Sequence, residues 1–295
     1  MRMTKIIRVL FLAGLLAGFI SAALAAHAIA DEASKAVKVL KPADKLITQD
    51  DSVPVEKSNG ETSVVKLKIG KNSVVVDAAD ENGEAVKVLK RVLRIPKFKD
   101  IDSSYWAKND IELTCAAGLF EKSRITYFRP DETISREKFA MLISLAVGVK
   151  LPVVKIAPAR DVKASNTNTK YDYYVIKERG IMDLDADGNF RPQDKITRAE
   201  AVMAIARLEH LTENWDMAEP PFADMQPRQN GARWISAVKN AGLLKFAEDR
   251  GYLDADGYLT NAEYAAIIAK TAEGKRAIAN ILNFDIGYSV EKAAK

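Results

Sequence analysis

The 295-residue chain carries 44 Lys and Arg against 40 Asp and Glu, a formal net charge of +4. This balance argues against nucleic acid as a partner, because a nucleic-acid-binding protein carries a concentrated basic surface. The single cysteine excludes an intramolecular disulfide, and the two histidines leave little material for Cys-His catalysis or a histidine-rich metal site.

The first 28 residues have the pattern of a secretory signal peptide. A basic segment with Arg2, Lys5 and Arg8 precedes an uncharged apolar stretch from Val9 to Leu24, and small residues follow it. The stretch of 16 residues is shorter than the roughly 20 that a membrane-spanning helix needs. We therefore predict export with cleavage, which leaves no integral membrane span and a charge near +1; a retained anchor is the alternative.

Residues 36–95 are predicted to form a small all-β module. Short β-branched runs are separated by Gly-Lys-Asn at 70–72 and Glu-Asn-Gly at 81–83, which is typical of antiparallel hairpins. The phrase KIGKNSVVVDAADENGE resembles the end of bacterial immunoglobulin-like modules. The region is shorter than the roughly 100 residues of a full sandwich, so the resemblance implies a reduced one. A plain β-hairpin spacer is the alternative.

The rest of the chain is internally repetitive, and such a period indicates a repeat architecture. Three sets of landmarks share spacings of 61 to 63 residues: Asp100, Asp161 and Asp224; Gly118, Gly180 and Gly242; and Arg136, Arg198 and Asn261. We place the repeats at residues 98–150, 159–211 and 220–273, followed by a C-terminal tail at 274–295.

Each repeat is predicted to fold as a helix, a glycine stop, a loop and a second helix. The three glycines suit the left-handed position beyond a helix end. The second helices begin after Ser135, Thr197 and Thr260, and the two threonines are each followed by a Glu three residues later, which makes capping boxes. Cys115 lies in an apolar helical run and is predicted to be a small buried side chain.

The order of these motifs resembles the S-layer homology (SLH) repeat. The chain has F-x-D, then W-A, a helix ending in G-L or G-I, F-R-P and finally I-T-R-A-E. The third repeat departs from this pattern at Leu253 and Asn261. The resemblance implies a mostly α fold in which three helix-loop-helix repeats form a pseudo-threefold unit with grooves between its prongs. It also implies non-covalent attachment to cell-wall polysaccharide, often bearing acidic pyruvyl groups, or to peptidoglycan.

The predicted ligand-binding residues are Arg136, Arg198, Trp106, Trp234, Asp100 and Asp161. The two arginines correspond between repeats, as do the two aspartates, whereas Trp234 lies one helical turn after Asn230, the residue that corresponds to Trp106. An arginine at the first residue of a helix joins free backbone amides and the helix dipole in attracting an anion. Its guanidinium can bind a carboxylate through two hydrogen bonds. The indole of Trp106 offers a flat face to a sugar ring. Structural roles are the alternative for all six, and Asn261 leads us to expect at most two competent grooves.

A calcium-loop pattern overlaps the second repeat. Asp183, Asp185 and Asp187 occupy positions 1, 3 and 5 of a twelve-residue loop, and Asp194 occupies position 12. Position 12 is Asp instead of the bidentate Glu, Pro192 interrupts the loop, and the first repeat has no equivalent ladder of carboxylates. Calcium at this loop is therefore an alternative to an Asp/Gly-rich turn, and no other cofactor is indicated.

No motif pairs the carboxylates for catalysis. We predict a non-catalytic envelope protein on the cell surface or the periplasmic face, in which the β module is carried by a triple-repeat wall anchor. A further interaction considered for such a protein is self-association in a surface layer. The alternative function is a surface or periplasmic protein-binding adaptor, with or without dependence on calcium.

Overall fold

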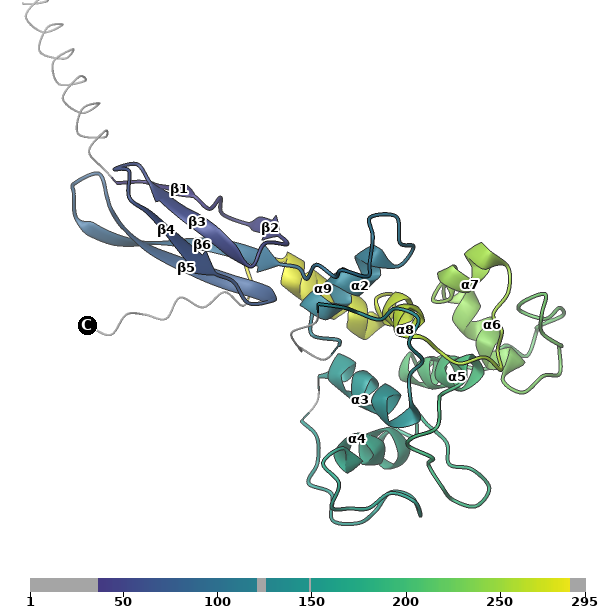
Figure 1. Cartoon of the computed structure of the whole chain (residues 1–295). Coiled ribbons are helices and arrows are strands. Elements are labelled where there is room, and N and C mark those ends of the chain that lie inside the picture. The colour runs from purple at the N-terminus through teal and green to yellow at the C-terminus, as the bar shows by residue number, and fades with distance from the viewer. Residues whose placement is uncertain (1–36, 121–125, 149, 287–295) are drawn as a thin grey trace, which may run out of the picture.

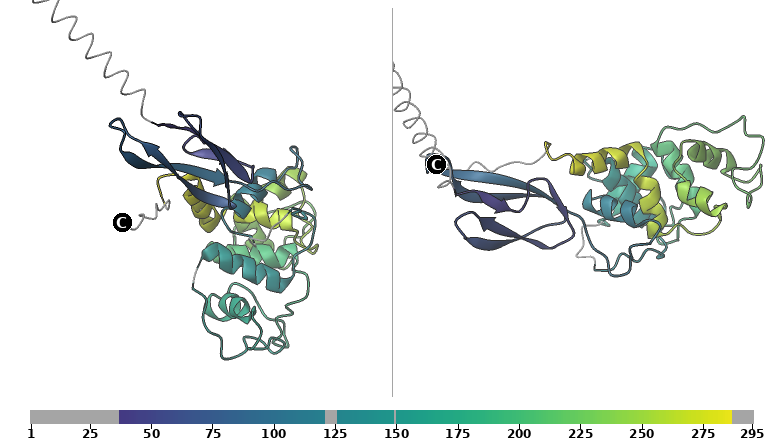
Figure 2. Two further views of the ribbon diagram at one scale, coloured as in Figure 1. Left: turned by 60° about the vertical axis from the view of Figure 1, so that its left-hand side comes forward. Right: turned by 90° about the horizontal axis from the view of Figure 1, so that it is seen from above.

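The computed structural model describes residues 37–120, 126–148 and 150–286. The signal-peptide prediction lies outside these residues. A β-rich module and a helical unit lie end to end, with the β module at one end of the elongated molecule (Figures 1 and 2). Within the described ranges, no helix combines the length and apolar character needed to cross a membrane.

The β module consists of two three-stranded sheets. One sheet has the order β1-β3-β4, with β1 at Val39–Lys41, β3 at Ser52–Lys57 and β4 at Thr62–Lys66. The other has the order β2-β6-β5, with β2 at Leu46–Thr48, β5 at Gly70–Ala79 and β6 at Ala85–Arg94. Alternate strand side chains, together with Leu67 of the β4–β5 connection, bury a small core: Val53, Val55, Leu67, Val74, Val76 and Val92.

Two features of the β module differ from the expectation of successive antiparallel hairpins. The β3–β4 and β5–β6 pairs are antiparallel, but β2 pairs with β6 in parallel. The turn predicted at residues 70–72 is also wrong, because β5 already begins at Gly70 and the connection lies at 67–69. Asn72 lies within β5 and stabilises the preceding connection. Its side chain accepts a hydrogen bond from the Lys68 amide at 2.8 Å and donates one to the Lys68 carbonyl at 2.7 Å. The immunoglobulin-like resemblance stays a prediction.

The helical unit follows from residue 98 onward. Its helices are α2 (Lys108–Ala116), α3 (Arg136–Val147), α4 (Thr169–Tyr173) with the π-helical turn η1 (Tyr174–Glu178), α5 (Arg198–Leu208), α6 (Ala232–Asn240), α7 (Lys245–Arg250), α8 (Asn261–Ile268) and α9 (Ala272–Leu282). The second helix of each predicted repeat packs against the first helix of another, in the pairs α3 with α4, α5 with α6, and α8 with α2. One continuous apolar core therefore runs through all three segments.

The glycine stops and the helix caps predicted from the sequence are confirmed by the structure. Gly118, Gly180 and Gly242 have left-handed backbones, with φ of 79°, 57° and 74°. Ser135 caps α3, and Thr197 and Thr260 form complete capping boxes on α5 and α8. Cys115 is buried as predicted, and this burial raises the pKa of its thiol to about 12.

Two helices were not predicted. Helix α7 lies in the loop of the third repeat, and α9 occupies much of the segment interpreted as a C-terminal tail. Helix α9 packs against α2 and α3. Its Gly274 passes so close to α8 that an added Cβ would lie 1.7 Å from the carbonyl oxygen of Ile268, so only glycine fits there.

Among the described residues, polar contacts join the two modules near both ends of the helical unit. Near the start of the helical unit, the Gln49 amide donates to Glu112 on α2 at 2.8 Å. Beyond α9, the segment 283–286 returns to the sheet, where Arg91 on β6 donates to the Phe284 carbonyl at 3.0 Å and pairs with Asp285 at 2.8 Å. Both ends of the helical unit thus hold the β module, as the two further views show (Figure 2).

Candidate ligand-binding crevices

The three segments are linked by a closed ring of hydrogen bonds near the starts of α3, α5 and α8. The Ile134 amide donates to the Leu259 carbonyl at 2.9 Å, Leu259 donates to Ile196 at 3.0 Å, and Ile196 donates to Ile134 at 3.0 Å. All three isoleucine and leucine side chains are fully buried. The ring places the starts of the three helices around one centre, so each start faces a loop of a neighbouring segment.

The backbone amides at these helix starts are already used. In each helix the first two amides donate to loop carbonyls of another segment at 2.8–3.0 Å: Arg136 to Asp194, Glu137 to Pro192, Arg198 to Gly257, Ala199 to Ala255, Asn261 to Glu132 and Ala262 to Pro130. The third amide donates to the capping side chain. The expectation of free amides awaiting an anion is therefore wrong, because the fold closes on itself at the positions that a ligand would need.

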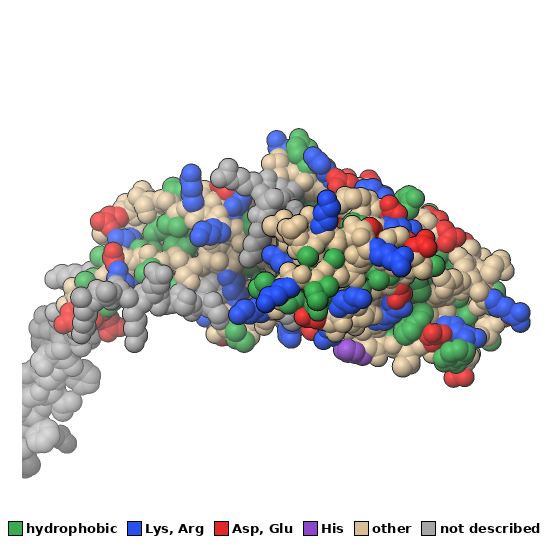
Figure 3. All heavy atoms as spheres, turned by 90° about the horizontal axis from the view of Figure 1, so that it is seen from below, with side chains coloured by type: hydrophobic (Ala, Val, Ile, Leu, Met, Phe, Trp, Pro, Cys, Tyr) green, Lys and Arg blue, Asp and Glu red, His purple; other side chains and the backbone are tan. Residues whose placement is uncertain are grey.

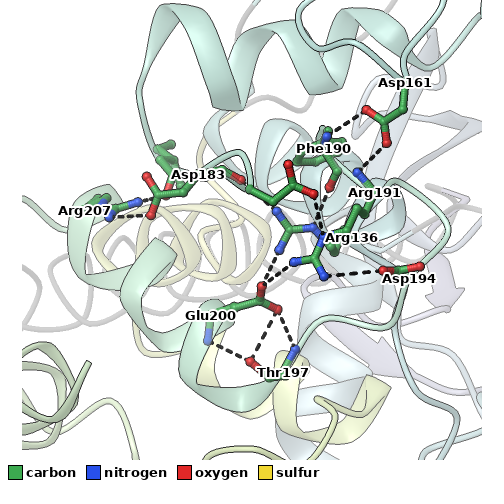
Figure 4. Close-up of polar contacts among 11 residues, drawn as sticks. Arg136, Asp161, Asp183, Phe190, Arg191, Asp194, Thr197, Glu200 and Arg207 are labelled. Atoms are coloured by element: carbon green, nitrogen blue, oxygen red, sulfur yellow. Dashed lines mark hydrogen bonds and ion pairs between the residues drawn. The ribbon is translucent and has the colours of Figure 1, made fainter. Parts of the chain in front are cut away.

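Arg136 is a buried brace between the first two segments (Figure 4). Its side chain is 4% exposed, and it donates to the Phe190 carbonyl at 2.7 Å, the Asp183 carbonyl at 2.8 Å and the Glu200 carboxylate at 2.7 Å. The guanidinium also lies 5.0 Å from the centroid of the Phe190 ring. All three guanidinium nitrogens of Arg136 therefore have partners within the protein.

Arg198 occupies the equivalent position between the second and third segments. Its Nε donates to both oxygens of Glu263 at 3.0 and 2.9 Å, and one terminal nitrogen donates to Asp254 at 2.8 Å. Arg250 binds the same Glu263 at 2.9 Å. The Arg198 side chain is 12% exposed, and it forms one wall of an open crevice.

Asn261 takes the place of the arginine at the third position, and it too is buried. Its side-chain nitrogen donates to the Arg129 carbonyl at 2.9 Å, and its oxygen accepts a bond from Lys138 at 3.1 Å. The shorter Asn261 side chain thus donates one short hydrogen bond to the loop of the first segment. The boundary between the third and first segments therefore has an amide where the other two boundaries have a guanidinium.

Asp100 and Asp161 have the same structural role in their two segments: each binds backbone amides of a loop. Asp100 accepts bonds from the amides of Phe128 and Arg129 at 2.9 and 2.7 Å, and Asp161 accepts bonds from those of Phe190 and Arg191 at 2.7 Å each. Asp224 holds Leu253 and Asp254 in the same way. These bonds fix loop residues with left-handed backbones, namely Arg129, Arg191 and Asp254. Both carboxylate oxygens are occupied, and a direct ligand contact of Asp100 and Asp161 stays a prediction.

Trp106 lies at the mouth of the crevice that Arg198 borders. The indole is 54% exposed and stacks on Phe246, with ring centroids 5.8 Å apart and an interplanar angle of 29°. The crevice has a volume of about 440 Å³. Its walls come from all three segments: Tyr105, Trp106, Asp131, Arg198, Phe246, Asp249, Arg250, Thr260 and Glu263. We call it the Trp106 crevice.

A second crevice lies over Arg136 and has a volume of about 180 Å³. We call it the Arg191 crevice, because Arg191 is 46% exposed there and lies 3.6–3.7 Å from Asp185, Asp194 and Glu200. Arg207 joins it and pairs with Asp183 at 2.8 Å. Trp234 is not in this lining but borders a neighbouring depression with Arg207.

Sequence reasoning missed many of the lining residues, among them Arg191, Arg207, Phe246 and Arg250. Arg191 belongs to the F-R-P motif, and this motif could have identified it. Arg207 lies nine residues after Arg198 in the same helix. Phe246 and Arg250 lie on α7, the unpredicted helix, so no repeat signal pointed to them. The crevices therefore combine motif residues with side chains peculiar to one repeat.

The structure does not assemble the calcium loop. Asp183 pairs with Arg207, Asp194 faces Arg191, and Asp185 accepts bonds from the amides of its own turn at Asp187 and Asn189. The Asn189 amide is the main cause that lowers the pKa of Asp185. In the described part of the chain, no group of three His, Cys, Asp or Glu side chains is placed to hold a metal ion. The segment is an Asp/Gly-rich turn in this structure.

Comparisons with known proteins find a known domain within the helical unit. A family model described as the S-layer homology domain matches residues 97–140 and 175–202. The chain is 30% identical over 176 residues to an amylopullulanase of Thermoanaerobacterium thermosulfurigenes, covering 58% of this chain and 9% of that protein. It is 33% identical over 106 residues to the S-layer protein sap of Bacillus anthracis, covering 36% and 13%.

A third relative is the surface-layer 125 kDa protein of Lysinibacillus sphaericus, which is 26% identical over 174 residues, or 58% of this chain and 14% of that protein. The chain thus spans less than a fifth of the length of these curated relatives. The matched residues contain α2 and the starts of α3 and α5, and the starts of α3 and α5 meet at the Arg136 boundary. The chain therefore contains S-layer homology sequence and is an exported, cell-wall-associated protein of the cell surface.

Proposed function

We propose that this chain attaches non-covalently to the cell wall, without catalysis, through the crevices between three SLH repeats. The ligand is cell-wall polysaccharide or peptidoglycan. The observation that carries the proposal is the Trp106 crevice, where an exposed indole lies beside hydrogen-bonding side chains from three segments. Aromatic faces beside a few polar groups are typical of small-molecule sites, and about 440 Å³ is enough for sugar rings.

The third repeat and the pseudo-threefold arrangement are part of this proposal. They are supported by the closed ring of Ile134, Ile196 and Leu259, by the equivalent roles of Asp100, Asp161 and Asp224, and by the three matching helix pairs. With this arrangement, one rigid body presents two arginine-bearing crevices. Two weak contacts to one polymer then raise the overall affinity by multivalency.

The carboxylates that border the arginines favour attachment over catalysis. Glu200 binds Arg136, and Glu263 binds both Arg198 and Arg250. These carboxylates also complete the capping boxes of α5 and α8, so they hold helices in place. Their geometry serves the scaffold and leaves the exposed aromatic and arginine side chains to meet a ligand.

Sedimentation with purified cell-wall sacculi tests the proposal. We expect the wild type to pellet and Trp106→Ala to lose at least about tenfold in apparent affinity, because a stacked ring contributes on the order of 1–3 kcal/mol when it is fully covered. Trp215→Ala is the matched control: its indole is 69% exposed and lies under Arg233, outside the Trp106 crevice. Failure of the wild type to pellet with any wall fraction would overturn the proposal.

Exposed residues are the right probes for this test. Alanine at Arg136 would remove a buried brace, so a loss of binding would only report a loosened fold. Trp106 supports little of the core, and unfolding by urea checks that its variant remains folded. Self-association in a surface layer is a separate prediction, and sedimentation velocity of the mature chain at rising concentration decides it.

A further inference from the structure

We propose that the exposed edge of strand β5 is a self-association site, at which a second copy of this chain adds its own β5 in antiparallel orientation. The two strands pair about a centre at Val74, and the two β2-β6-β5 sheets, each of three strands, become one continuous sheet. This inference does not depend on the proposed wall attachment, and it specifies how the chain self-associates.

Strand β5 is an edge without the usual structural protection. It lies at the end of the strand order β2-β6-β5, and it is ten residues long. It pairs with β6 in one uninterrupted antiparallel register from Gly70 to Ala79, so the strand contains neither a bulge nor a proline. Natural proteins often protect an edge with such features or with a covering segment, because its outward backbone groups attract another strand.

Alternate residues of β5 point their backbone groups away from the sheet. The Asp80 amide donates to the Glu84 carbonyl at 2.9 Å, which identifies the even-numbered residues of β5 as those bonded to β6. The odd-numbered residues therefore direct their amides and carbonyls to the outer side. The Ala79 amide agrees with this direction, because it donates to the Val37 carbonyl at 3.4 Å on that side. We call residues 71–77 the edge segment.

The edge segment lies between two contacts with other parts of the chain. One is the bond to the Val37 carbonyl. The other is at Gly70, where an added Cβ would lie 3.2 Å from a backbone oxygen of α2. Between these contacts, the outward backbone groups of Ser73, Val75 and Asp77 have no hydrogen-bonding partner in the described part of the chain. These groups are therefore available to an added strand.

The side chains of the edge segment suit a contact between strands. Val74 and Val76 point into the core of the β module, so Ser73, Val75 and Asp77 lie on its outer face. Val75 is 42% exposed there. In the view of Figure 3, apolar side chains of the β module are exposed among basic and acidic ones. A β-branched side chain on an edge strand gains packing from a cross-strand neighbour.

The charges of the edge segment complement a second copy in one register. An antiparallel pair of identical strands has a twofold axis, so every contact across it occurs twice. A centre at Val74 places Lys71 opposite the partner's Asp77, and Ser73 opposite the partner's Val75. Two pairs of opposite charge thus cross the junction, and any other register loses both. Charges that discourage pairing with other strands therefore favour pairing with this one.

Both charged side chains have contacts within their own chain, and these contacts keep them on the outer face. The Asp77 carboxylate pairs with Lys87 at 3.2 Å, but its side chain is 79% exposed and can accept a bond from a second cation. The Lys71 ammonium group donates to the carbonyls of Asn283 and Ile286. Exposed ion pairs contribute little each, so the backbone bonds of the added strand supply most of the affinity.

Sedimentation velocity of the mature chain tests the inference. We expect monomers to become dimers as the concentration rises between about 1 and about 200 µM, the weak range of a small interface. A chain that stays monomeric over this range would overturn the inference. Sacculus pelleting is measured separately, so a monomer that still pellets would leave the proposed wall attachment standing.

Val75→Pro tests whether β5 is the contact. The Val75 amide faces the outer side, so proline removes a bond of the dimer and no bond of the monomer. Val64→Pro is the matched control: it lies on β4, the edge of the other sheet, and its amide also faces outward, as the bond from Lys57 to Glu61 indicates. We expect the dissociation constant to rise at least about tenfold for Val75→Pro and less than about threefold for the control. Equal values for the two variants would contradict the inference.

An exchange of charges tests the register. Asp77→Lys places lysine opposite the partner's Lys71, and Lys71→Asp places aspartate opposite the partner's Asp77. We expect each single variant to weaken dimerisation by at least about fivefold, because like charges oppose each other twice. The double variant restores opposite charges, and we expect its dissociation constant to return to within about twofold of the wild type. A double variant that dimerises no better than the single variants would show that the strands do not pair about Val74.

Discussion

Arg136 and Arg198 begin equivalent helices in successive repeats, yet the two boundaries that they hold differ in chemistry. Arg136 is 4% exposed and divides its bonds between two backbone carbonyls and Glu200. Arg198 is 12% exposed and depends mainly on two carboxylates, one of which also has Arg250. The same motif residue is thus bound mainly by backbone carbonyls at one boundary and mainly by carboxylates at the other, because the loop that it meets is different.

The helix pairs behind these boundaries differ as well. By the 62-residue spacing, Asp110, Asp172 and Trp234 are equivalent, and so are Lys270, Leu145 and Arg207, each nine residues after its helix start. Asp110 pairs with Lys270 at 2.8 Å. Asp172 is 1% exposed, and one of its oxygens has no partner in the described residues. The residue that corresponds to Lys270 at this boundary is Leu145, which carries no charge. The boundary between the first two segments therefore contains an arginine whose guanidinium nitrogens all have partners. It also contains a buried carboxylate with an oxygen that has no partner among the described residues.

The largest effect is expected from Arg136→Ala. It leaves the Phe190 and Asp183 carbonyls and Glu200 without their donor, so we expect a loss of about 3–5 kcal/mol in the free energy of unfolding. Urea denaturation measures it. Arg129→Ala is the control, because that side chain is 73% exposed and its ion pair with Glu132, at 3.4 Å, lies on the surface. We expect this variant to change the free energy of unfolding by less than about 0.5 kcal/mol. Equal effects of the two variants would contradict the brace.

Arg198→Ala is expected to cost less, about 1.5–3 kcal/mol, because Glu263 keeps its bond to Arg250. The same denaturation series measures it. Arg250→Ala in the Arg198→Ala background then removes the second cation, and we expect the combined loss to exceed the sum of the single losses. If Arg198→Ala proves as costly as Arg136→Ala, the distinction between the two boundaries is wrong.

Asp172→Asn probes the first boundary through pH. Burial, reinforced by Glu137 and Asp161, raises the pKa of Asp172 to about 7. The wild type therefore loses stability as pH rises from about 4 through about 7, where the unfolded chain has released the proton and the folded chain still holds it. We expect the variant to match the wild type near pH 4 and to exceed it by on the order of 2 kcal/mol above pH 7.

The control for this experiment is Asp110→Asn, which breaks the ion pair with Lys270 and is expected to lower stability at neutral pH. Melting curves of the three proteins across the pH range give the comparison. A gap between Asp172→Asn and the wild type that narrows with rising pH would show that Asp172 is charged and paired in the folded protein.

Local features of this fold could be predicted from the sequence because they depend on neighbours along the chain. The capping boxes at Thr197 and Thr260 and the left-handed glycines each involve residues within a few positions of one another. The hairpin between β5 and β6 depends on Gly83 in the same way. The repeat period also identified Arg136 and Arg198 as equivalent, which the ring of hydrogen bonds explains.

The sequence by itself determined where the first helix of each repeat ends, where the second helix begins, and which residues correspond between repeats. Only the tertiary structure decided what those residues do. Arg136 became a brace because the Phe190 and Asp183 carbonyls, about fifty residues away, come within hydrogen-bonding distance of it. The Trp106 crevice exists because α7 brings Phe246 and Arg250 to a segment more than a hundred residues earlier. Such contacts depend on how three segments close around one core, and no local pattern encodes that closure.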